Sequence, residues 1–412
     1  MAMIAAQLPN PWDGLEGGLF ERPARPLAAQ DPASWHGSEG GLFEPLSPLP
    51  PMPRARHAAR GRRAALPAPR QGGDRLGWVD TARGLTMIMV VLLHADVVAT
   101  AIGQQSVPIT LLDFALYPLR MPMFFLVSGM LAAGLLQRSA EEVLHRRVLH
   151  YAWLYALWSL IYAGLQAGLM AGLGPPAMRA YYNNIEGPVA ALLVTWNNTW
   201  FLYALMLFFG IALVLRRLPP AAQMAAALLL ALPGTLAWGT AIGLPVLDRF
   251  YHLPYFVFGI LASARLKEAA PRLGRPALLV PIVLVWGGLT LFAQHERVLR
   301  EPPVIAALSL LAVPAGLGLA ALLAARLPWL ARPLQVIGRN TLAIYVLHTL
   351  LLRPMMALLP WQALPGAVAL PLLALTAVGL ALVLGKGLAR VPGLLAVPRL
   401  GRKTEPALAG TR

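Results

Sequence analysis

The sequence predicts an all-α fold, a polytopic transmembrane helix bundle of about ten spans that follows a disordered N-terminal tail. Composition is the first reason, because 58% of the 412 residues are hydrophobic and only 13% are charged, whereas soluble domains carry about 25% charged residues. The mean hydropathy of +0.61 agrees with this class. The second reason is the recurrence of apolar runs of about 20 residues, and the third is that basic residues gather between alternate runs.

Residues 1–76 are predicted to form a disordered, Pro/Arg-rich cytoplasmic tail, because they contain many prolines and no sustained hydrophobic period. The hexapeptide EGGLFE occurs there twice, at residues 16–21 and 39–44. The two copies either bind a cytoplasmic partner or are drifted low-complexity sequence. Seven arginines in residues 54–75 either contact anionic membrane lipid or simply set the topology of the first span.

Residues 77–390 are predicted to form the membrane domain, and residues 391–412 a short basic cytoplasmic tail. The predicted spans are residues 83–101, 117–137, 149–171, 200–215, 221–240, 253–266, 277–293, 304–325, 341–358 and 367–388.

Charge alternates along the connections between these spans. The connections after even-numbered spans are rich in arginine and lysine, whereas the others carry only Arg179, Arg249, Arg297 and Arg300. Both termini are therefore expected in the cytoplasm. The same pattern accounts for the net charge of +16, so no nucleic-acid partner is expected. Arginine greatly outnumbers lysine, which is typical of GC-rich bacterial genomes and indicates a bacterial cytoplasmic (inner) membrane.

The chain contains no cysteine. Disulfides, thiolate metal sites and an acyl-cysteine intermediate are therefore excluded, and we expect neither a metal site nor a bound cofactor. Any nucleophile or base must be another residue type.

The first predicted span contains two ionisable residues, Arg83 and His94, although such groups are costly in a membrane. His94 follows Arg83 by 11 positions, close to three turns at about 3.6 residues per turn. Both side chains are therefore expected on nearly the same helix face, roughly 16 Å apart along the axis. Histidine, with an ordinary pKa of about 6.5, suits a general base near neutral pH.

Five motifs in order resemble the acyltransferase-3 superfamily of integral membrane acyltransferases, and most closely its fucose O-acetylase-like branch. The family's first span carries Arg or Lys, ten residues and then His, which here are Arg83 and His94. The other four motifs are RMPMFFLVSGML, NNTWFLYALMLFF, YHLPYFVFGIL and IGRNTLAIYVLHTLLL, which begin at residues 120, 197, 251 and 337. The resemblance covers about residues 78–388.

The resemblance implies transfer of an acyl group, usually acetyl, from cytoplasmic acyl-CoA as co-substrate to a hydroxyl of a carbohydrate acceptor. His94 would be the catalytic base, and Arg83 would face the phosphate-bearing donor. Many relatives carry a spaced arginine pair after the second span, where this chain has the adjacent Arg146 and Arg147. These two arginines are the further candidates for donor binding.

Each candidate residue could instead have a structural role without taking part in the reaction. His94 could form a hydrogen bond to a neighbouring helix, and Arg83 could anchor the cytoplasmic end of its span. Arg120 could pair with a carboxylate such as Asp113 or Asp96, or it could orient the acceptor.

The remaining candidates lie in later motifs. Trp200 could stack on a sugar or anchor its span at the membrane interface. His348, one turn from Tyr345, could contact the acceptor or bridge two helices.

A transporter or flippase for a small polar or glycan substrate is the alternative class. Many proton-coupled carriers use a carboxylate in the bilayer core, and here every Asp and Glu is predicted at or beyond the end of a span. This distribution favours the enzyme over the transporter.

Overall fold

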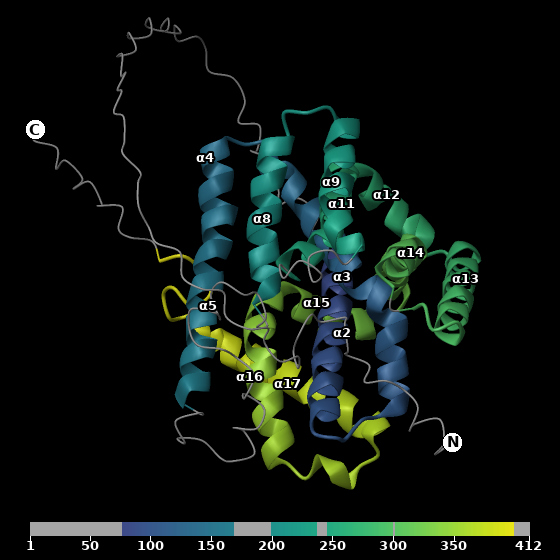
Figure 1. Cartoon of the computed structure of the whole chain (residues 1–412), viewed down its shortest axis with the longest axis vertical. Coiled ribbons are helices and arrows are strands. Elements are labelled where there is room, and N and C mark those ends of the chain that lie inside the picture. Colours follow the sequence, from purple (N-terminus) through teal and green to yellow (C-terminus); the bar gives the residue numbers. More distant parts are fainter. Residues whose placement is uncertain (1–75, 169–198, 237–244, 300, 399–412) are drawn as a thin grey trace, which may run out of the picture. The chain divides into compact units, whose positions relative to one another are not determined.

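The computed structural model describes residues 76–168, 199–236, 245–299 and 301–398, and every regular element in these ranges is helical (Figure 1). The predicted N-terminal tail lies outside the described residues, as does the C-terminal tail from residue 399. The long elements are α2 (Gly77–Ala101), α3 (Val107–Leu136), α5 (Leu149–Gly168), α8 (Trp200–Leu215), α9 (Pro220–Thr235), α13 (Pro276–His295), α14 (Pro302–Arg326), α16 (Thr341–Leu358) and α17 (Gly366–Leu388). The shorter ones are α4 (Ala140–Val143), the π-helix η1 (Leu144–Val148), the 3₁₀ helix η3 (Pro245–His252), α11 (Leu253–Leu261), α12 (Ser263–Leu273), α15 (Pro328–Arg339) and the 3₁₀ helix η4 (Trp361–Ala363).

In the part of the chain that the structure describes, each predicted span coincides with helix, which confirms the all-α membrane class. Within the described residues, seven helical stretches are long and apolar enough to cross a membrane, one of them continuous through α4, η1 and α5. The apolar helices α8 and α9 are shorter, and the predicted span 253–266 is divided between α11 and α12 at Ala262. A total of about ten spans stays a prediction.

Two of the differences from the sequence prediction affect how the helices pack. Helix α3 begins at Val107, ten positions before the predicted start at residue 117, because Pro108 occupies the first turn, where its missing N–H costs nothing. Asp113 therefore lies inside a membrane helix. The sequence also did not predict α15, a short amphipathic helix whose limited apolar stretch cannot cross a bilayer.

Helix α2 is the centre of the packing and contacts α3, α14, α15, α16 and α17. Glycines allow its closest approach, to α15. A Cβ atom at Gly84 would collide with the carbonyl oxygen of Leu334, and one at Gly338 would collide with the carbonyl oxygen of Asp80. An ion pair of 3.1 Å between Arg339 Nε and Asp80 Oδ2 adds to this contact.

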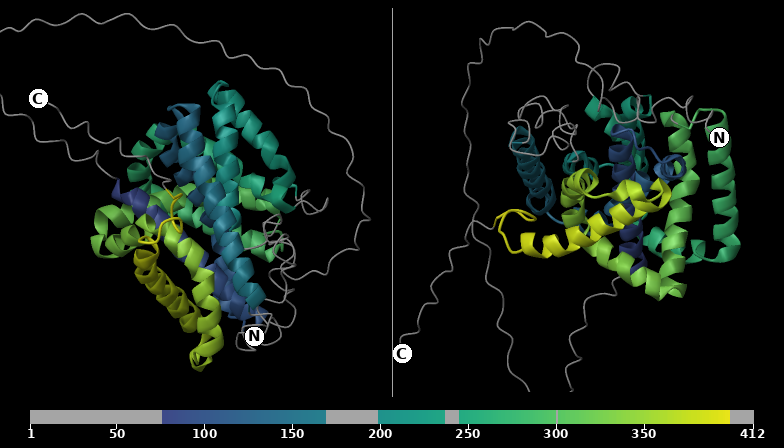
Figure 2. Two further views of the ribbon diagram at one scale, coloured as in Figure 1. Left: turned by 90° about the vertical axis from the view of Figure 1, so that its left-hand side faces the viewer. Right: turned by 90° about the horizontal axis from the view of Figure 1, so that it is seen from below.

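Contacts between side chains define the helix directions around α2. Thr110 of α3 reaches Asp96 and Arg120 of α3 reaches the carbonyl of Met89, so α2 and α3 are antiparallel. Arg83 contacts Thr341 at the start of α16, whereas the His94 ring contacts a residue further along α16, so these helices run in the same direction. Helix α5 lies at one side of the bundle and α13 at the opposite side (Figures 1 and 2).

Candidate active site

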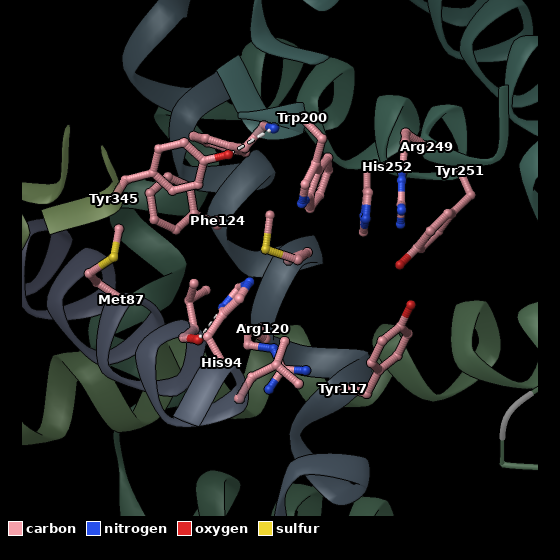
Figure 3. Close-up of a pocket in the computed structure, with 14 residues that line it drawn as sticks. Met87, His94, Tyr117, Arg120, Phe124, Trp200, Arg249, Tyr251, His252 and Tyr345 are labelled. Atoms are coloured by element: carbon pink, nitrogen blue, oxygen red, sulfur yellow. Dashed lines mark hydrogen bonds between the residues drawn. The ribbon is translucent and has the colours of Figure 1, made fainter. Parts of the chain in front are cut away.

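A cavity lies where α2, α3, α8, α16 and η3 meet (Figure 3). The space between its walls, including the solvent in its opening, measures about 660 Å³. The apolar wall consists of Met87, Val90, Leu93, Met121, Phe124 and Phe201. The polar and large aromatic groups are His94, Tyr117, Arg120, Trp200, Arg249, Tyr251, His252 and Tyr345.

The His94 ring is oriented by its own helix. Its Nδ1 lies 2.8 Å from the carbonyl oxygen of Val90, one turn earlier in α2. Because a carbonyl only accepts hydrogen bonds, Nδ1 carries the proton, and Nε2 is the nitrogen that can take up another. The backbone thus fixes the tautomer that a general base requires.

His348 supports the His94 ring from α16. The two rings meet edge to face with centroids 4.8 Å apart. The Nδ1 of His348 donates to backbone oxygens of its own helix, 2.7 Å from Tyr345 O and 3.1 Å from Ile344 O. His348 is fully buried and is not among the residues that line the cavity. The contact that it makes across helices is ring packing, rather than the hydrogen bond that sequence reasoning considered.

Arg120 pairs with Asp113, one of the two carboxylates that the sequence suggested. Its Nη1 lies 3.2 Å from Asp113 Oδ1, and both side chains are 2% exposed. Asp96 lies in the same buried cluster and accepts a hydrogen bond of 2.9 Å from the hydroxyl of Thr110. Asp96 and Asp113 therefore lie inside membrane helices, so the premise that every carboxylate lies at or beyond the end of a span is wrong.

Tyr345 and Trp200 both reach the cavity, at the point where α8 begins. The Tyr345 hydroxyl accepts a hydrogen bond of 3.1 Å from the backbone N–H of Phe201, drawn as a dashed line in Figure 3. This bond satisfies one of the amide groups that every helix N-terminus leaves without a partner. Trp200 packs with the rings of Phe125 and His252. It is thus part of the cavity wall within the helix bundle.

Sequence reasoning assigned no role to Tyr117, Arg249, Tyr251 or His252, all of which line the cavity. In Figure 3 the hydroxyls of Tyr117 and Tyr251 point toward one another. His252 is 1% exposed and stacks on Phe125 with ring centroids 4.9 Å apart. A signal was present, because Arg249 is one of the few basic residues in the basic-poor connections and lies two positions before the YHLPY motif.

The three arginines expected to bind the donor lie away from this cavity. Arg83 donates from Nη2 to Thr341 Oγ1 at 2.7 Å. Arg147 lies over the Phe209 ring at 5.8 Å, and Tyr151 lies close to both Arg83 and Arg147.

Arg146 is separated from that group. It is 64% exposed and pairs with Glu142 at 3.1 Å, whereas the Nε of Arg147 is buried and has no hydrogen-bond partner among the described residues. Tyr151 therefore has both Arg83 and Arg147 within electrostatic range, whereas Arg146 lies at the surface.

Comparison with known protein families gives a match over the helical region of the chain. An acyltransferase domain model, that of the acyltransferase-3 family, matches residues 76–386, from the start of α2 almost to the end of α17. This match does not distinguish the fucose O-acetylase-like branch from other branches. No curated protein and no solved structure matches the chain.

Proposed function

The chain belongs to the acyltransferase-3 family, and we propose that this acyltransferase is a membrane-embedded O-acyltransferase of the bacterial inner membrane. In this proposal it moves an acyl group, usually acetyl, from cytoplasmic acyl-CoA to a hydroxyl of a cell-envelope glycan or related carbohydrate. Both termini lie in the cytoplasm, as the distribution of basic residues predicts.

The observation that carries this proposal is the fixed tautomer of His94 at the cavity wall. Because Nδ1 donates to Val90 O, Nε2 can accept the proton of the acceptor hydroxyl as its oxygen attacks the thioester carbonyl. The C–S bond then breaks, and the proton passes from Nε2 to the departing CoA sulfur. Arg120 shares the cavity with His94 and supplies positive charge toward the oxyanion that forms during the attack.

The donor would enter from the Gly77 end of α2. Arg83 and Arg147 both lie within electrostatic range of Tyr151, and arginine forms strong charge-assisted hydrogen bonds with phosphate. Arg83 and His94 lie on the same helix, about 16 Å apart along its axis. A donor held by its phosphates at this end would extend its thioester along α2 toward His94. Arg146, which is paired with Glu142 at the surface, contributes at most to attraction of the donor.

Replacement of His94 tests the proposal. We expect His94→Ala to fold and insert normally but to transfer labelled acetyl from acetyl-CoA to envelope glycans about 100-fold more slowly, the usual scale for loss of a general base. His295→Ala, which changes an exposed histidine at the end of α13, is the matched control and should keep wild-type activity. Near-normal transfer by a well-folded His94→Ala protein would remove His94 from the mechanism.

A further inference from the structure

Arg249 is a charged side chain in the cavity that the proposed mechanism does not use. It is half-buried in η3, and its guanidinium carbon lies 5.0 Å from the centre of the Trp200 ring. Among the described side chains, no carboxylate forms an ion pair with it. Arg120 differs, because the buried Asp113 carboxylate beside it balances its charge.

A half-buried charge beside apolar and aromatic side chains loses part of its hydration, which is costly unless the charge is paired. The contact with Trp200 offsets part of this cost, because a cation over an aromatic ring is stabilised by about 0.5–2 kcal/mol. The desolvation free energy that this contact leaves uncompensated makes packing on tryptophan an insufficient role for the arginine. It favours an arginine whose partner is an anion that enters with a substrate.

The position of Arg249 indicates which substrate brings this anion. Arg249 packs on Trp200, the first residue of α8, whereas Arg147 packs on Phe209. These two positions on α8 are nine residues apart, about 13 Å along the helix axis. Phosphates of a donor held by Arg83 and Arg147 would therefore lie near the opposite part of α8, so the anion at Arg249 belongs to the acceptor.

We propose that Arg249 binds an oxyanionic group, a carboxylate or a phosphate, on the acceptor, and that the acceptor is therefore an anionic carbohydrate. This inference rests on the proposed O-acyltransferase function. Figure 3 shows Arg249 and Tyr251 across the cavity from His94, so an acceptor that spans the cavity can place its anion at Arg249 and a hydroxyl at His94. The hydroxyls of Tyr117 and Tyr251 add hydrogen-bonding groups on the Arg249 side. Trp200 positions the guanidinium by stacking against it.

The first test uses the unmodified protein, reconstituted in vesicles with labelled acetyl-CoA and total envelope glycans from cells that lack it. After transfer, the glycans are separated by anion exchange. We expect the label in the retained, anionic fraction. Label confined to the unretained, neutral fraction would overturn the inference while leaving the O-acyltransferase function intact. Absence of label from both fractions would overturn the proposed function itself.

Chemical treatment of the glycans distinguishes the two oxyanions. Reduction of carboxyl groups before the assay should abolish acceptor activity if the anion is a carboxylate. Cleavage of phosphoesters should abolish it if the anion is a phosphate. Acceptor activity that survives both treatments would contradict an anionic acceptor.

The second test changes the arginine. Arg249→Gln should raise the KM for the anionic glycan fraction at least tenfold and leave the Kd for acetyl-CoA unchanged, and Arg249→Lys should restore part of the loss because it keeps the charge. Arg297→Gln, which removes an exposed arginine from another basic-poor connection, is the matched control. An unchanged acceptor KM in folded Arg249→Gln would overturn the assignment, as would an equal loss in Arg249→Gln and Arg249→Lys.

Discussion

The buried pair of Arg120 and Asp113 allows a prediction in which stability and activity change separately. Arg120→Met would leave the Asp113 carboxylate buried without its cation and close to Asp96, whose charge Arg120 also offsets. Breaking a buried ion pair on one side usually costs about 3–5 kcal/mol, whereas replacing both partners with apolar residues is often close to neutral. The double variant Arg120→Met/Asp113→Leu should therefore recover most of the free energy of unfolding that the single variant loses.

Activity should not recover in the same way. The double variant lacks the cation that we propose stabilises the oxyanion, so we expect acyl transfer to stay at least about tenfold below wild type, equivalent to about 1.4 kcal/mol in the barrier. Unfolding in mixed detergent micelles measures stability, and transfer from labelled acetyl-CoA measures activity. Arg146→Met provides a control, because its exposed pair with Glu142 should contribute at most about 1 kcal/mol. If the double variant were as unstable as Arg120→Met, or fully active, the role given to this pair would be refuted.

Two further predictions concern packing and topology. Gly84→Val should prevent α15 from packing on α2, because the new side chain collides with Leu334 O, whereas Gly164→Val meets open space; size-exclusion chromatography should show loss of monodisperse protein for the first variant alone. In this cysteine-free chain, a cysteine at Gln104 should react with an impermeant thiol reagent added outside, and one at Ser139 should not. The opposite labelling pattern would invert the topology and place the donor on the other side.

Composition was sufficient to identify the membrane class of the protein, and the family motifs together with local spacing indicated His94 as the main catalytic candidate. Apolar runs of spanning length predict membrane helices because burial in a bilayer depends on local hydrophobicity. The separation of Arg83 and His94 places both on one helix face because helical periodicity is fixed. The sequence predicted a carboxylate partner for Arg120 and left Asp113 and Asp96 open. The early start of α3 at Val107 decided for Asp113, because it places the two residues seven positions apart on one helix.

The tertiary structure decided which residues line the cavity. Arg249 and Tyr251 lie more than 150 positions after His94 in the sequence, and they line the same cavity only because η3, α2 and α3 meet there. A 3₁₀ segment such as η3 has no long apolar period that could reveal its orientation.

Arg146 and Arg147 also show that the sequence could not predict which neighbour a side chain would meet. Sequence reasoning treated Arg146 and Arg147 as equivalent, yet consecutive helical side chains point in different directions. Packing of η1 against α8 turns Arg147 over Phe209 and leaves Arg146 at the surface with Glu142. The sequence by itself therefore determined where the long apolar helices form and which residues share a face, because those properties are local. Which face meets which neighbour depends on packing between segments far apart in the chain, and only the tertiary structure decided it.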